Sequence, residues 1–91
     1  MATFTLPEKL TAETVVELHM AFSQKVESCD SKAVIDSGEL IETDLLGLQF
    51  LAVLVADLAR RSVVVVWDNL SIDLYQSADE LGLCGALQLE L

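Results

Sequence analysis

Residue types that commonly build catalytic and ligand-binding sites are scarce in this sequence. Its 91 residues include a single histidine, four glycines and two cysteines. The glycines are scattered, which excludes a glycine-rich phosphate-binding loop. Cys29 and Cys84 match no spacing of zinc ligands. We therefore expect no metal site and no cofactor, and the sequence predicts a protein that is not an enzyme.

Basic residues are also few. Five Lys and Arg residues stand against fifteen Asp and Glu residues, which gives a net charge of −10. Nucleic acids and anionic membranes attract basic surfaces, so this balance argues against both as partners. The charge is compatible with plain solubility or with a basic protein partner.

Long hydrophobic runs are absent as well. The longest apolar stretches, residues 50–56 and 63–67, are far shorter than the ~20 residues that a membrane-spanning helix needs. No basic segment followed by a long apolar run marks a secretory signal, and the two cysteines are interpreted as reduced thiols. We expect a cytoplasmic protein without membrane insertion.

Hydrophobic residues, in contrast, are abundant. They make up 53% of the chain, and the mean hydropathy is +0.50. Residues 41–61 are the densest part, since apolar residues recur there every three to four positions and extend around most of a helix. Thr43 and Asp44 suit the helix start, and Arg60 and Arg61 suit its end. Such a helix is buried or covered by a partner, so we expect the function at or beside it.

The rest of the chain alternates between strand and helix patterns. The expected elements are a strand at residues 2–6 on a sheet edge, a helix from the Thr11 cap to residue 26, a strand at 33–35, the central helix, a strand at 63–67, a helix from the Ser71 cap to residue 81 and a tail at 83–91. The stripe expected on the first helix includes Val16, and that on the last includes Ile72. The tail fits either an edge strand or a short helix.

This order predicts a single α/β domain over residues 1–91. Alternating strands and helices favour a mostly parallel sheet, here of about four strands, with helices packed on it. The unbroken β-branched run at residues 63–67 is typical of an interior strand buried on both faces.

The remaining candidates for chemistry have ordinary explanations. His19 lies among apolar residues of the first helix, which favours a structural or surface histidine over a catalytic one. A nucleophilic cysteine paired with it stays an alternative. Acidic residues 36, 39, 42 and 44 show no calcium-loop pattern, so a solvated acidic rim is favoured over a metal site.

The segment IDSGELIETDLLGL, residues 35–48, resembles the signature of the STAS domain, the fold of anti-sigma factor antagonists. On this resemblance Asp36 is the acid that ends a strand, and Asp44, Gly47 and Leu48 fall on the motif that starts the following helix. Residues 63–83 are similar to the closing strand, turn and helix of the family. The N-terminal region matches in pattern only, and it offers one strand where the family usually has two.

The chain departs from the family at the residues that carry regulation. In anti-sigma factor antagonists a serine just after the motif Asp is phosphorylated, and the added charge disrupts the complex. Leu45 and Leu46 occupy those positions here, and neither accepts phosphate. Thr43 is the nearest hydroxyl and is the candidate for a shifted phosphoacceptor, with a plain helix-entry threonine as the alternative. Ser37 is a weaker candidate.

Two leucines in the first helical turn make this surface more apolar than in the family. Neighbouring helical residues diverge by ~100°, so we expect Leu45 to pack inward and Leu46 to face outward. Gln49 and Val53 continue the side of Leu46. The residues that we expect to contact a partner are Thr43, Asp44, Leu45, Leu46, Gly47 and Gln49.

The resemblance implies a non-enzymatic protein-interaction module in signal transduction and regulation. The partners that it implies are an anti-sigma factor or histidine-kinase-like ATPase, the ATPase of an ABC transporter, and a chemotaxis component. Binding would use the N-terminus of the central helix, without the usual serine phospho-switch. A STAS domain that senses a small ligand, such as a lipid or a nucleotide, is one alternative. A homodimeric structural module is another.

Overall fold

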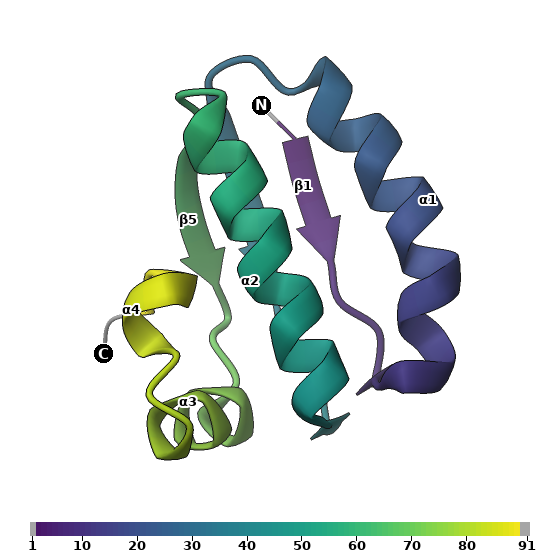
Figure 1. The fold of residues 1–91 in the computed structure, drawn as a ribbon, viewed down its shortest axis with the longest axis vertical. Coiled ribbons are helices and arrows are strands. Elements are labelled where there is room, and N and C mark those ends of the chain that lie inside the picture. The colour runs from purple at the N-terminus through teal and green to yellow at the C-terminus, as the bar shows by residue number, and fades with distance from the viewer. Residues whose placement is uncertain (1, 90–91) are drawn as a thin grey trace.

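Three parallel strands form the main sheet of the computed structural model, which describes residues 2–89 (Figure 1). Their order is β1 (Ala2–Thr5), β3 (Lys32–Asp36) and β5 (Val64–Asp68), with β3 in the centre. The register sets Phe4 beside Ile35, and Ile35 beside Trp67. The predicted α/β class, the parallel sheet and the N-terminal edge strand are confirmed.

Two long helices cover one face of this sheet, as Figure 1 shows. Helix α1 (Ala12–Ser28) leads to β3, and α2 (Leu45–Arg60) leads to β5. The shorter helices α3 (Ile72–Glu80) and α4 (Cys84–Leu87) follow β5, and α4 packs against α2. The tail thus forms a short helix, while its last residues, 90 and 91, lie outside the described residues.

A second, smaller sheet pairs β2 (Lys9–Leu10) with β4 (Glu42–Thr43) in parallel. It lies at the carboxyl end of the main sheet, where both α1 and α2 begin (Figure 1). The single sheet of about four strands expected from the sequence is therefore a three-stranded sheet with this short pair beside it. Such short strands leave no periodic pattern in a sequence.

The core lies between the helices and the covered face of the sheet. Phe4 and Ile35 are fully buried there, together with Leu51 of α2. Phe22 meets the Phe4 ring edge-on, with the ring centroids 5.2 Å apart, a geometry that aromatic pairs favour. Burial of these side chains fixes α1 and α2 on one side of the sheet.

The other face of the sheet carries no helix, and this corrects the prediction for β5. The strand lies at the edge of the sheet, and Val64 is 61% exposed on the uncovered face. A run of valines occurs in edge strands as well as in interior strands, because the hydrophobic pattern of a strand does not show which segment covers each of its faces. Buried strands and half-exposed valine strands look alike in sequence.

Two apolar side chains expected on buried helix stripes also face outward. Val16 on α1 is 74% exposed and Ile72 on α3 is 69% exposed. Each helix turns only one narrow stripe toward the core, at Phe22 and Val26 in α1 and at Leu74 and Ala78 in α3. None of the helices within residues 2–89 combines the length and apolarity needed to cross a membrane.

Candidate protein-docking site

The start of α2 is held by the small sheet. Thr43 Oγ1 donates a hydrogen bond to the carbonyl oxygen of Leu10 at 2.9 Å, and the Asp44 N–H donates to the same oxygen at 3.3 Å. Because Leu10 ends β2 and Thr43 ends β4, one carbonyl group connects the two strands where each leads into a helix. The first turn of α2 therefore has a defined position relative to α1.

Asp44 joins the starts of both long helices. One carboxylate oxygen accepts from the Gly47 N–H at 2.9 Å, which caps α2. The other accepts from the Ala12 N–H of α1 at 3.1 Å. The bonds from Gly47 and then Ala12 hold the pKa of Asp44 below its ordinary value of 3.8. The sequence suggested the cap, but the contact with α1 joins positions 32 residues apart.

Gly47 is required by close packing against the small sheet. A side-chain carbon at this position would overlap the Leu10 carbonyl oxygen and would lie 2.7 Å from Thr43 Oγ1. Gly47 is buried. Gly47 was expected to touch a partner. Its role in the fold is to leave room for the end of β2, and it has no side chain to offer a docking protein.

Leu45 and Leu46 both face solvent, with exposed fractions of 53% and 50%. The outward orientation of Leu46 is confirmed, and Gln49 and Val53 are exposed as expected. The inward orientation of Leu45 was wrong. Leu48 and Leu51 supply the buried stripe of α2, so a residue at the very start of the helix projects beyond the core.

A groove of about 290 Å³ lies between α3 and the segment that contains β4, and its lining reaches Thr43, two residues before Leu45. Ile41, which is 65% exposed, contributes an apolar wall. Glu42, Asp73 and Glu80 contribute carboxylates to the same groove. The contribution of α3 was missed, because no sequence signal places α3 beside β4.

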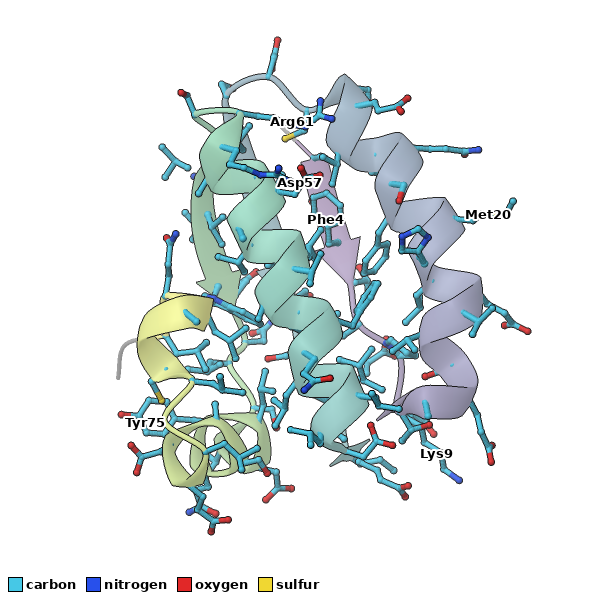
Figure 2. The ribbon with its side chains drawn as sticks, in the orientation of Figure 1. Phe4, Lys9, Met20, Asp57, Arg61 and Tyr75 are labelled. Atoms are coloured by element: carbon cyan, nitrogen blue, oxygen red, sulfur yellow. The ribbon has the colours of Figure 1, made fainter. Side chains whose placement is uncertain are left out.

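Charge is distributed unevenly along the molecule. The parallel strands begin at one end of the sheet, and α1 and α2 end there. Basic residues at these positions therefore lie at that end: Lys25, Lys32, Arg60 and Arg61. Figure 2 shows Arg61 near Asp57 at this end and Lys9 at the opposite end, where α2 begins. Apart from Lys9, the charged residues described around the start of α2 are acidic. An exposed apolar pair thus lies on an acidic surface.

The polar residues at the end of β3 have structural roles. The buried Ser37 hydroxyl donates to the Asn69 carbonyl oxygen at 3.2 Å and accepts from the Ser71 N–H at 2.9 Å. Asp36 accepts from the Gly38 N–H at 2.9 Å. These bonds connect the loop after β3 to the start of α3, and they engage the hydroxyl of Ser37 inside the protein.

The other candidate groups lie apart from this surface. His19 is exposed on α1, and the thiols of Cys29 and Cys84 are free. Within the part of the chain that the structure describes, no group of three or more His, Cys, Asp or Glu side chains is placed to hold a metal ion.

In comparisons with known proteins, no protein-family model matches this chain, and no curated protein matches it.

Replacing Asp44 by Ala tests the connection between the helices. We expect a lower free energy of unfolding than in the wild type at neutral pH, because the N–H groups of Ala12 and Gly47 lose their acceptor. The folded-state pKa of Asp44 is lowered, so its contribution is complete above the ordinary pKa of 3.8 and disappears as the pH falls through the folded value. Urea unfolding at a series of pH values measures this difference.

Asp79→Ala is the matched control for that experiment. Asp79 lies exposed on α3, and its carboxylate accepts no hydrogen bond among the described residues. We expect it to change stability little and without the same pH dependence. A deficit in Asp44→Ala that stays constant throughout the acidic range would contradict the assignment.

Gly47→Ala tests the close approach of β2 to α2. We expect a loss of about 3 kcal/mol in unfolding free energy, since the backbone at Leu10 must move to admit a methyl group. Gly85→Ala is the control, because a side-chain carbon there meets no atom within 4 Å, and we expect a change within about 1 kcal/mol. Denaturant unfolding compares the two, and equal effects would contradict the packing argument.

Proposed function

We propose that this protein is a STAS-type interaction module that binds a protein partner through the first turn of α2. The observation that supports this most directly is the exposure of both Leu45 and Leu46 on a helix start that is rigidly held. Asp44 and Gly47, which fall on the motif of that family, hold the helix start in place through contacts within the chain.

The two leucines supply the apolar part of the binding surface. Each is about half exposed, so covering both stabilises a complex by roughly 1–2 kcal/mol per side chain. Ile41 extends this surface across the groove to α3. Exposed apolar side chains that adjoin one another commonly mark a protein-binding surface.

The acidic surroundings define the partner by its chemistry. Glu42, Asp73 and Glu80 line the groove near the start of α2, so a complementary partner carries apolar residues flanked by Lys or Arg. Complementary charge accelerates association and selects against acidic partners. Among the partners that the resemblance implies, the ATPases and the anti-sigma factor remain the leading classes. On either of them, the expected contact region is an apolar patch flanked by Lys or Arg.

Binding in this proposal is constitutive. The Thr43 hydroxyl is half-buried and donates to the Leu10 carbonyl oxygen, so a phosphate there would have to displace that bond. The buried Ser37 hydroxyl is engaged with the α3 start. The two leucines leave no hydroxyl at the positions where the family is regulated.

Leu46→Asp tests the binding surface. The partner is first isolated by affinity capture from an extract of the native cells and then purified. We expect its dissociation constant for Leu46→Asp to rise at least about tenfold, because an apolar contact is lost and a carboxylate faces a partner that must desolvate it. Titration monitored by calorimetry gives the constant, and circular dichroism checks the fold.

The matched control is Met20→Asp. Met20 is 72% exposed on α1 and points away from α2 (Figure 2), so the same change of charge and polarity falls outside the surface. Equal binding by wild type and Leu46→Asp, or an equal loss in Met20→Asp, would overturn the proposal.

Thr43→Val tests the absence of a phospho-switch. The variant loses the hydrogen bond to Leu10, so we expect the unfolding free energy to fall by about 1 kcal/mol while the affinity for the purified partner stays within about twofold. Intact-mass analysis of the protein from native cells is expected to show no added phosphate. Phosphate on Thr43 together with altered binding would contradict constitutive docking.

A further inference from the structure

The outer edge of β5 carries backbone groups without partners. The Val64 N–H donates to the Ser31 carbonyl oxygen, and the Asp68 carbonyl oxygen accepts from the Ser37 N–H, so both residues turn their backbone groups toward β3. Alternation along the strand then turns the N–H and C=O groups of Val65 and Trp67 outward. Within residues 2–89, no backbone bond from the helices or loops reaches them.

The opposite edge of the sheet is partly occupied. On β1 the outward carbonyl oxygen of Thr3 accepts a hydrogen bond from the Lys25 ammonium group at 2.7 Å, and the same group lies 5.9 Å from the centre of the Phe4 ring. A lysine on an edge strand is a common device against strand pairing. The two edges therefore differ, because a lysine lies over an outward group of β1, whereas no side chain among the described residues bonds to the outward backbone groups of β5.

Apolar side chains of β5 border this edge on both faces of the sheet. On the uncovered face of the sheet, Val64 and Val66 have exposed fractions of 61% and 36%. A shallow hollow of about 330 Å³ opens at the same strand, lined by Val65, Val66, Trp67 and Gln88. An added strand would thus gain contacts on both faces as well as hydrogen bonds along its backbone.

The uncovered face of the sheet carries negative charge at one end and positive charge at the other. Asp36 and Asp68 stand directly opposite each other at the carboxyl end, where like charges are unfavourable. The Asp36 carboxylate accepts hydrogen bonds from the Gly38 N–H and the Asn69 side-chain amide, so Asp68 is the one of the two whose carboxylate has no partner among the described residues. No cation forms an ion pair with either of them among the described residues. At the other end of the same two strands, Lys32 stands beside Val64. A 180° rotation about an axis perpendicular to the sheet therefore places the negative end of one copy beside the positive end of the other.

We propose that a second copy of this chain pairs with the β5 edge, antiparallel, with Val66 opposite Val66 of the second copy. The two sheets then form one continuous sheet, related by a two-fold axis. This register sets Val65 opposite Trp67 of the second copy, and these residues exchange N–H···O bonds in both directions. Shifting the register by two residues leaves outward groups opposite Val63 or Asn69, and Val63 already donates its N–H to Leu58.

Side chains across the seam are compatible with this register. The Val66 side chains meet at the axis on the uncovered face, as a non-hydrogen-bonded pair with close side chains. Trp67 packs beside Val65 of the second copy on the other face, an aromatic and β-branched pair that sheets favour. Asp68 lies opposite Val64 of the second copy, and therefore one strand away from its Lys32, which supplies the missing counter-charge.

The dimer leaves the docking surface open. The seam runs along β5, whereas α2 begins at the lower end of the molecule in Figure 1, beside α3 and beyond the carboxyl end of β5. The antiparallel arrangement directs the two α2 starts in opposite directions, so each copy retains its own binding surface. The dimer is independent of the proposed function, and either can fail without the other.

The first experiment measures the association of full-length wild type and two proline variants by sedimentation across a concentration series. Val65→Pro removes an outward N–H that the monomer does not use, and we expect the dimer dissociation constant to rise at least about tenfold. Thr3→Pro is the control, because it makes the same change on the β1 edge, and we expect wild-type association. Circular dichroism checks that each variant is folded.

A charge swap decides the question even if Val65→Pro does not fold. In Lys32→Glu, a carboxylate replaces the ammonium group that lies one strand beyond the seam from each Asp68, and we expect about tenfold weaker association that recovers in Lys32→Glu with Asp68→Lys. Recovery in the double variant supports the register. Wild-type protein that stays monomeric at its highest soluble concentration overturns the proposal, and so does a dimer that neither Lys32→Glu nor a folded Val65→Pro weakens.

Discussion

The arrangement of this molecule depends on one carboxylate. Asp44 accepts from Gly47 at the start of α2 and from Ala12 at the start of α1, so the positive ends of both long helices share one anion. The Leu10 carbonyl oxygen makes the complementary connection by accepting from Thr43 and Asp44. These bonds set the height and angle at which α2 lies on the sheet, and they hold the first turn of α2 with its leucines exposed.

The same end of the molecule explains why residues that resemble a functional motif have structural roles. Asp44 caps the start of α2, and Gly47 leaves room for the end of β2 beside it. Contacts within the chain therefore explain both residues. The groups free to meet a partner are the neighbours that this framework pushes outward, Leu45 and Leu46. The motif and the proposed binding surface therefore overlap in sequence but use different side chains.

The main sheet has two unlike sides and two unlike edges. Its covered side meets α1 and α2, and at its β1 edge Lys25 occupies the outward carbonyl oxygen of Thr3. Its uncovered side and its edge at β5 retain valines and unpartnered backbone groups. Outside the core, exposed apolar side chains lie at the α2 start and at the β5 edge, and others are scattered over the helices, such as Val16 and Ile72. The α2 start and the β5 edge are separated, so the proposed docking and the proposed self-association use different surfaces.

Local chemistry in the sequence determined the elements. Thr11, Asp44 and Ser71 each stand at a helix start as predicted, and Gly82, with a φ of 70°, follows the end of α3, because caps and left-handed turns depend on residues close in the chain. The alternation of strand and helix likewise determined the parallel α/β class. Tertiary structure alone decided that β5 is an edge, that Leu45 faces solvent, that α3 borders the docking groove and that Asp44 reaches Ala12. Each of these features depends on which distant segment packs against a given element. The hydrophobic pattern of an element shows which of its faces is apolar, but not which segment covers that face.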